Sequence, residues 1–386
     1  MLKNEEIKNL LPSRIYFENL NAIRFIAAYL VIIFHTEKLK QYLNLPYYSD
    51  STISIFGKLG VVLFFVLSGF LISYLLFKEQ EITKTISIKD FYVRRILRIW
   101  PLYYLIIIIS LFIFPFIDFF TIPGFEKNFV FDNLFYKIIF YIFFLPNLVL
   151  TLYGLIPYAS QTWSIGAEEQ FYLVWPFLNK KIKNKWLLLS GVISIYLFIK
   201  FFASRLIPAG EYRNVFDGFW ESTPIDSMAI GGIFALIIYQ DSSINLFIKK
   251  ILFNKLFQWA TLLLTVILIY KAYHFPYLHY EFYSVLFGIL ICNFASNKRR
   301  IFSMENNVTN YLGKISYGLY MYHIIVIVFC IKILQMLNML SNFILYPLVL
   351  VLVVIVSSLS YEFFEKKFLN KKIKYTKLLS GDIVKE

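Results

Sequence analysis

The chain has 386 residues, of which 59% are hydrophobic and 20% aromatic, while only 16% are charged. A soluble globular domain carries about 25% charged residues and could not hide this much apolar surface in one core. The composition therefore excludes a soluble protein and predicts an all-α bundle of membrane-spanning helices. Both cysteines, Cys292 and Cys330, lie inside apolar runs, so we expect no disulfide framework, no metal site and no bound cofactor.

The formal charge of +14 comes from 38 Lys and Arg against 24 Asp and Glu. The basic residues gather in a few short segments and form no basic, aromatic face for stacking bases, so we expect no nucleic-acid partner. An excess of Lys and Arg in short linkers is typical of the cytoplasmic side of a membrane protein. We therefore expect the four most basic segments to be cytoplasmic, namely 78–98, 179–185, 297–314 and the tail at 366–377.

Eleven apolar stretches approach the length that spans a bilayer: 20–38, 55–77, 99–120, 134–152, 162–178, 186–203, 224–240, 256–272, 279–296, 315–334 and 343–364. Three of them lie between the first two basic linkers, yet an even number of crossings must occur there. We therefore expect ten net crossings with both termini cytoplasmic, and a partly irregular or re-entrant piece within 134–178. The weaker spanning candidate in that piece is 162–178, which contains Glu168 and Glu169. We expect one membrane domain over 1–386, with its core at about 16–368 and a short basic tail at 369–386.

The first apolar stretch contains Arg24 and His35. Eleven residues at about 100° each return the helix to within about 20° of its starting direction, so both side chains share one face, roughly 16 Å apart along the axis. Ionisable residues inside a membrane segment are expensive and mark functional sites by default. The alternatives are a histidine near the helix end at the interface and an arginine that snorkels to the headgroups.

The segment T-W-S-I-G-A-E-E-Q-F-Y places Ser164, Glu168 and Tyr172 at i, i+4 and i+8 on one helix face. A carboxylate next to an imidazole can hold its tautomer and raise its basicity, which makes Glu168 a catalytic candidate and Glu169 the competing one. A structural ion pair with a buried arginine is the other interpretation of this acidic pair.

Three further places carry candidate residues. Arg95 and Arg98 lie one helical turn apart and suit phosphate oxygens, although a cluster that touches only lipid headgroups fits the sequence equally well. His323 closes the motif S-Y-G-L-Y-M-Y-H, where a core histidine bonded to a neighbour is the alternative. Asp226 is another intramembrane acid, and its alternative is a structural hydrogen bond to a neighbouring helix end.

Six motifs in order along the chain resemble the acyltransferase-3 family of integral-membrane acyltransferases, which move acyl groups onto sugars and other cell-surface molecules in bacteria. The motifs are L-N-A-I-R-F-I-A-A-Y-L-V-I-I-F-H from Leu20, G-V-V-L-F-F-V-L-S-G-F-L-I-S from Gly60, the Arg95 and Arg98 pair, T-W-S-I-G-A-E-E-Q-F-Y, S-Y-G-L-Y-M-Y-H, and Y-E-F-F-E-K-K-F from Tyr361. The resemblance covers almost the whole chain, and the family's usual ten-helix domain agrees with the crossing count.

The resemblance implies that Arg24 and His35 are essential, that Arg95 and Arg98 help to hold the acyl donor, and that Glu168 lies near the centre. Ser68, in the second motif, and Tyr172 are additional site candidates. We expect an O-acyltransferase of the bacterial cytoplasmic membrane that uses acyl-CoA, with acetyl as the first expectation, to acylate a hydroxyl of a cell-surface carbohydrate or its lipid-linked precursor.

In this hypothesis His35 is the general base and Glu168 orients its ring, while a covalent acyl-histidine is the competing route. A transporter or flippase for a lipid-linked sugar is the alternative function, with the same buried charges as its substrate pathway. The acyl group, the acceptor, the side of transfer and the oligomeric state stay open.

Overall fold

Helices make up most of the computed structural model, which describes residues 14–376 and 379–380. The long helices are α2 (Leu20–Tyr42), α3 (Ser51–Thr83), α4 (Ile88–Phe112), α8 (Trp163–Lys181), α9 (Lys185–Phe198), α12 (Ile225–Tyr239), α14 (Lys255–Tyr270), α15 (His279–Ser296), α17 (Ser316–Met336) and α18 (Asn342–Ser360). The shorter ones are α5 (Lys127–Phe131), α6 (Leu134–Ile142), α7 (Pro146–Tyr153), α10 (Ser204–Leu206), α11 (Glu211–Glu221), α13 (Ser243–Leu252), α16 (Asn307–Lys314) and α19 (Lys366–Lys372).

Short turns and two strands complete the described chain. The 3-10 turns are η1 (Phe114–Phe116), η2 (Asp118–Phe120), η3 (Ser160–Thr162) and η6 (Ile373–Tyr375), and the π turns are η4 (Ile199–Ala203) and η5 (Tyr361–Glu365). Strand β1 (Arg14–Ile15) pairs in parallel with β2 (Leu379–Ser380). This pairing places the two ends of the described chain next to each other.

Seven helical stretches in the described chain are long and apolar enough to cross a membrane: Leu20–Tyr42, Ser51–Thr83, Ile88–Phe116, Lys185–Leu206, Glu211–Tyr239, Ser316–Met336 and Asn342–Tyr375. An eighth results if Ser243–Leu252 and Lys255–Tyr270, which meet at a bend of 65°, count as one span. The all-helical membrane bundle is therefore confirmed, whereas the ten crossings and the cytoplasmic position of both termini stay predictions.

The irregular segment within 134–178 differs from the expectation in one respect. The stretch with two carboxyls is one continuous helix, α8, and the break lies in the preceding stretch, between α6 and α7. Phe144 there adopts a left-handed backbone with φ of 57°, and Pro146, which lacks an N–H, begins α7. Polar residues did not weaken α8 because a helix satisfies its own backbone, whatever its side chains carry.

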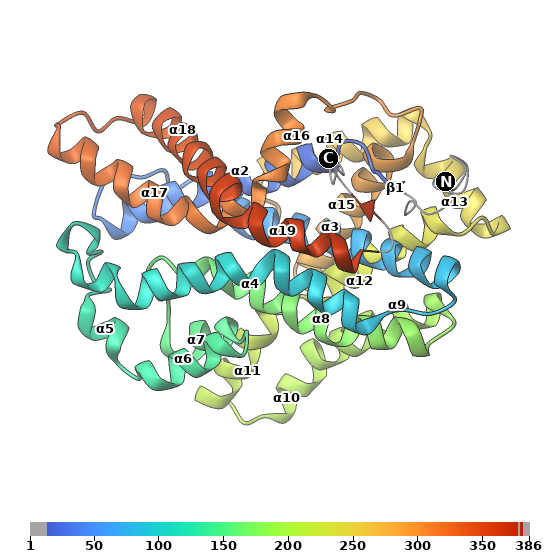
Figure 1. Ribbon diagram of the computed structural model, residues 1–386, viewed down its shortest axis with the longest axis horizontal. Helices are drawn as coiled ribbons and strands as arrows, with labels where there is room; N and C mark the ends of the chain where they lie inside the picture. The colour runs from blue at the N-terminus through green and yellow to red at the C-terminus, as the bar shows by residue number, and fades with distance from the viewer. Residues whose placement is uncertain (1–13, 377–378, 381–386) are drawn as a thin grey trace, which may run out of the picture.

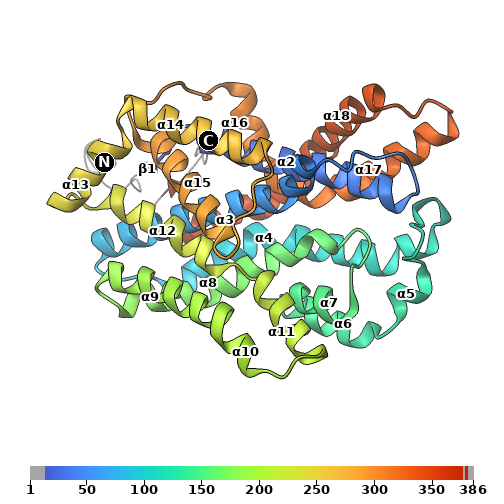
Figure 2. The ribbon, with the colours of Figure 1, turned by 180° about the vertical axis from the view of Figure 1, so that it is seen from behind.

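Helix α3 forms the centre of the bundle, where it packs against α2, α12 and α15 (Figures 1 and 2). Its contact with α12 is close because a Cβ atom on Gly231 would lie 2.0 Å from the carbonyl oxygen of Val66, and one on Gly69 would lie 1.9 Å from that of Met228. Small residues permit such helix approach in membranes. About 72% of the most apolar part of α3 is buried, against 17% for the span that contains α9, so α9 lies at the periphery of the bundle.

Candidate active site

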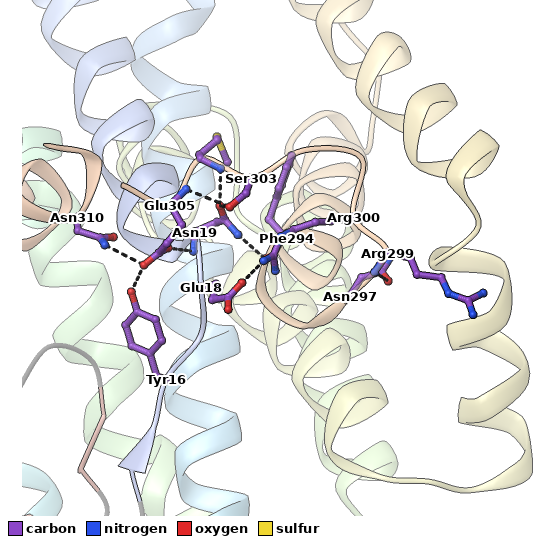
Figure 3. Close-up of polar contacts among 11 residues, drawn as sticks. Tyr16, Glu18, Asn19, Phe294, Asn297, Arg299, Arg300, Ser303, Glu305 and Asn310 are labelled. Atoms are coloured by element: carbon purple, nitrogen blue, oxygen red, sulfur yellow. Dashed lines mark hydrogen bonds and ion pairs between the residues drawn. The ribbon is translucent and has the colours of Figure 1, made fainter. Parts of the chain in front are cut away.

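The start of α2 is fixed by a polar cluster that Figure 3 shows. Asn19 is fully buried and donates from Nδ2 to the carbonyl oxygen of Phe294 at 2.9 Å. Its Oδ1 accepts from Ser303 at 3.0 Å and from the backbone N–H of Met304 at 2.6 Å. Its own backbone N–H donates to Glu305 at 2.5 Å. A buried side chain held by three hydrogen bonds determines where α2 enters the bundle, and hence where the polar residues along it lie.

A cavity of about 730 Å³ opens beside α2, and its lining is rich in charged side chains. Arg24 lines it and donates to Asn21 of the same helix at 2.8 Å. The cations in the lining are Arg24, Arg95, Arg98, Lys314, Lys366 and Lys372, and the carboxylates are Glu168 and Glu365. Six cations against two carboxylates leave a formal surplus of four positive charges, so this cavity suits a ligand with several negative charges. We call it the cationic cavity.

Arg95 and Arg98 of α4 both line the cationic cavity. The Arg95 guanidinium lies 5.7 Å from the ring centre of Tyr172 and 5.9 Å from that of Phe91. Its Nε is buried and has no hydrogen-bond acceptor among the described residues. A guanidinium held by aromatic faces keeps its fork of N–H groups available for an anionic ligand.

Glu168 also lines the cationic cavity, where it accepts a hydrogen bond of 2.7 Å from Ser68. The structure thus brings together Glu168, Ser68, Tyr172 and Arg95, which the sequence singled out in three different motifs. Glu169 points elsewhere, because its Oε2 accepts from the indole N–H of Trp100 at 3.1 Å.

His35 opens onto a different and smaller cavity of about 200 Å³. Other residues of this cavity are largely apolar and aromatic, among them Phe34, Tyr42, Phe125 and Trp163, with Lys38 as a cation. We call it the histidine cavity. Arg24 and His35 do share α2, but each lines its own cavity.

Two histidines from different helices meet beside the histidine cavity. Nδ1 of the fully buried His323 lies 2.6 Å from the carbonyl oxygen of Tyr320, which can only accept, so a neutral His323 carries its hydrogen on Nδ1. Its Nε2 is then an acceptor, and it lies 3.1 Å from Nδ1 of His35. The carbonyl oxygen of Val31 lies 3.0 Å from the same Nδ1. Since both neighbours of that atom accept, Nδ1 of His35 carries the hydrogen and Nε2 keeps its lone pair.

This pairing replaces a contact that the sequence hypothesis required. Glu168 was expected to orient the His35 ring, but its side chain hydrogen-bonds Ser68, in the other cavity. The position expected for Glu168 is taken by His323, which was only an additional candidate. Asp226 lines neither cavity; it is 1% exposed on α12, and both its carboxyl oxygens lack a hydrogen-bond donor among the described residues.

Side chains of α8 and α17 separate the two cavities. Ser164 Oγ lies 2.7 Å from the Tyr320 hydroxyl, and both side chains line the cationic cavity. That hydroxyl also donates to the carbonyl oxygen of Gln161 at 2.9 Å. One helical turn further along α17, Ile324 lines the histidine cavity. Four helical residues rise by about 6 Å, so the linings of the two cavities come within about one turn of each other along α17, and we call Ser164 and Tyr320 at this place the septum.

Sequence reasoning missed three members of the site: Tyr320, Glu365 and Lys372. Tyr320 lies within a quoted motif, and its spacing of three from His323 was the available signal. Glu365 lies in the quoted motif Y-E-F-F-E-K-K-F, which was its available signal. Lys372 lies in the basic C-terminal segment, where nothing in the pattern of lysines distinguishes a buried one from its exposed neighbours.

The sequence profile of a family described as "Acyltransferase domain" matches residues 17–362. The peptidoglycan O-acetyltransferase OatA of Listeria monocytogenes is 27% identical over 81% of this chain and 49% of its own length. The putative peptidoglycan O-acetyltransferase YrhL of Bacillus subtilis is 27% identical over 91% of this chain and 54% of its own. A putative O-acetyltransferase of Staphylococcus aureus strain COL is 27% identical over 93% and 58%. The chain thus spans about half the length of the curated relatives it matches. No solved structure matches it.

Proposed function

We propose that this chain, which belongs to the acyltransferase-3 family, transfers an acyl group from acyl-CoA to a hydroxyl of a cell-surface glycan. Acetyl is the acyl group that we expect first. One observation carries the proposal: a cationic cavity and a cavity with an available histidine nitrogen end about one helical turn apart. That arrangement fits a reaction between a polyanionic donor and a neutral hydroxyl acceptor that enter from different sides.

The donor half of the proposal rests on charge and size. Coenzyme A carries its phosphates at one end and its thioester at the end of a long flexible arm. The cationic cavity places Arg95 and Arg98 where phosphate oxygens can bind, and its 730 Å³ lies within the range of cavities that hold small ligands. The pantetheine arm then leads the thioester toward Ser164 and Tyr320, which close the cavity toward the histidines.

The acceptor half rests on the histidine cavity. Aromatic faces such as those of Tyr42, Phe125 and Trp163 suit the apolar faces of a sugar ring, and Lys38 adds a donor for its oxygens. Two of the relatives named above are called peptidoglycan O-acetyltransferases, one of them putatively. A glycan hydroxyl, of peptidoglycan or of a related surface polymer, is therefore the acceptor that we propose.

The chemical step begins with Nε2 of His35 as general base. It removes the proton of the glycan hydroxyl while that oxygen attacks the thioester carbonyl, and the imidazolium is stabilised by the acceptors at Nδ1, Val31 and His323. The C–S bond then breaks, and the departing thiolate of CoA takes the proton back from His35. Arg24 and Glu168 act from the donor side, where Arg24 offsets negative charge on the donor and Glu168 holds Ser68.

The bacterial cytoplasmic membrane is the location that fits this proposal, because acyl-CoA is made in the cytoplasm and the relatives are bacterial. The basic linkers then lie on the cytoplasmic side, where acyl-CoA is made. A bundle that binds the donor from one side and the glycan from the other also supplies a route for an acyl group across the bilayer.

The test is transfer of label from radioactive acetyl-CoA in membranes that contain this chain, with lipid-linked and polymeric carbohydrate fractions counted separately. We expect label in a carbohydrate fraction with the wild type and with His274→Ala, which changes an exposed histidine, but not with His35→Ala. Label that is equal in all three contradicts the role of His35. No label from acetyl-CoA or succinyl-CoA, together with movement of lipid-linked sugar in vesicles, favours the transporter.

A further inference from the structure

The C-terminal helix α19 crosses α4 and contributes to the cationic cavity, as Figure 1 shows for the two helices. It begins after residue 362, where the match to the family profile ends. Four of its seven residues are lysines, and three of these, Lys366, Lys367 and Lys371, are exposed. The fourth, Lys372, is only 5% exposed and faces the cavity.

Burial of an ammonium group is costly unless a partner offsets its charge. No hydrogen-bond acceptor for the Lys372 ammonium is recorded among residues 14–376 and 379–380, and its strongest ionic neighbours are other cations. Those neighbours are Arg98, Arg95, Arg94 and Arg24, all of which repel it. Of these four, Arg94 is paired with a carboxylate, that of Glu79 at 3.2 Å.

The cavity offers Lys372 little compensation. Glu365 is the last residue of the π turn that directly precedes α19, but its Oε1 accepts from Ser360 at 3.0 Å. Glu168 is engaged with Ser68. A cluster of Arg95, Arg98 and Lys372 around one space, without a carboxylate bonded to any of the three among the described residues, is the arrangement that a polyphosphate ligand would complete.

We propose that Lys372 is a third phosphate ligand of the coenzyme A donor, which it binds together with Arg95 and Arg98. This inference rests on the proposed function, since it takes the donor to be an acyl-CoA. It adds that the C-terminal helix is part of the donor site. A compact ammonium complements two planar guanidiniums here, because it can bind a phosphate oxygen from any direction.

The experiment measures binding of CoA itself to the purified full chain, by calorimetry and by the rise in melting temperature that CoA causes. The variants are Lys372→Met, Lys367→Met as the exposed control on the same helix, and Arg98→Met as the reference for loss of a donor ligand. We expect Lys372→Met to raise the Kd for CoA about tenfold or more and to shrink the CoA-dependent rise in melting temperature. Without CoA, its melting temperature should equal or exceed that of the wild type, because repulsion among the cations is relieved.

The outcomes separate this inference from the proposed function. A Lys372→Met protein that binds CoA as tightly as the wild type, while Arg98→Met does not, overturns the role of Lys372 alone. A wild type that binds no CoA overturns both. A purely structural Lys372 predicts a lower melting temperature in the absence of CoA and an unchanged CoA-dependent rise.

Discussion

Nε2 of His323 lies 3.1 Å from Nδ1 of His35, so two helices far apart in the sequence share one hydrogen bond beside the histidine cavity. His323 acts here as a positioning residue: its ring sets which nitrogen of His35 stays basic. No charged group is needed for this, because a neutral imidazole whose Nδ1 is held by a carbonyl is itself a hydrogen-bond acceptor.

Replacement of His323 tests this relationship. We expect His323→Phe to lower kcat about 100-fold, at the lower end of the effect of losing a general base, with little change in KM for acetyl-CoA. His323→Gln, whose amide oxygen can accept from Nδ1 of His35, should keep more of the activity than His323→Phe. Steady-state kinetics on both variants are the measurement, and equal losses in the two, or a change confined to KM, would contradict the assignment.

The two adjacent acids of α8 should differ in importance because they face different surroundings. Glu168 lines the cationic cavity and accepts from Ser68, whereas Glu169 accepts from Trp100. Hydrogen bonds to charged groups contribute about 1.5–3 kcal/mol, so we expect Glu168→Gln to reduce transfer about tenfold or more and Glu169→Gln to leave it within about twofold. The measurement is the acyl-transfer rate of the two isosteric variants, and a greater loss with Glu169→Gln would show that Glu169 is the more important acid.

The close contact of α3 with α12 should not tolerate one added methyl group. In Gly231→Ala the new Cβ would lie 2.0 Å from the carbonyl oxygen of Val66, a backbone atom that cannot rotate away. We expect a loss of about 1–3 kcal/mol of stability, which appears as a lower melting temperature in detergent. The matched control is Gly191→Ala on α9, where no atom lies within 4 Å of the new Cβ and helix propensity favours alanine. Equal melting temperatures for the two variants would contradict this packing argument.

The anchor of α2 should make stability depend on pH. Burial raises the pKa of Glu305, but hydrogen bonds from Tyr16, the Asn19 backbone and Asn310 lower it more, so the net pKa lies below its ordinary value. A carboxyl whose pKa is lowered by folding adds stability above its unfolded pKa of about 4.3, and this stability is lost as pH falls through the lower folded pKa.

Melting temperatures of the wild type between pH 7 and pH 3 should therefore fall more steeply than those of Glu305→Gln, which has no charge to lose. Glu211→Gln changes an exposed acid on α11 and serves as the control. Parallel curves for the wild type and Glu305→Gln would show that this carboxylate does not contribute.

The sequence predicted the helices of this fold better than the contacts between them. Hydropathy and period located α2, α4, α8 and α17, because burial in lipid requires continuous apolar helices. Period alone also placed Arg24 and His35 on one helix face, but it carried no information on what packs against that face. The packing of Tyr320 and His323 of α17 against α2 depends on the tertiary structure, and it accounts for the separate cavities of Arg24 and His35.

The candidate site could likewise be predicted from the sequence only in part. Motifs identified Glu168, Arg95 and Ser68 one by one, and only the fold shows that they share a cavity. The break between α6 and α7 lies within the predicted range 134–178, but the carboxyls of 162–178 drew attention to α8, which is continuous, whereas Pro146 and the left-handed Phe144 mark the actual break. Lys372 could not be selected among the lysines of its helix, since its burial depends on how α19 lies on α4.

The septum of Ser164 and Tyr320 also affects how much of the acyl-CoA thioester is lost to hydrolysis. Water is abundant in the cell, and a general base in direct contact with the acyl-CoA donor would activate water to hydrolyse the thioester. Transfer requires the hydrogen-bonded pair of Ser164 and Tyr320 to part, and while the pair is closed the idle enzyme should release little acetate. Tyr320→Ala removes this closure and should raise acetyl-CoA hydrolysis in the absence of an acceptor.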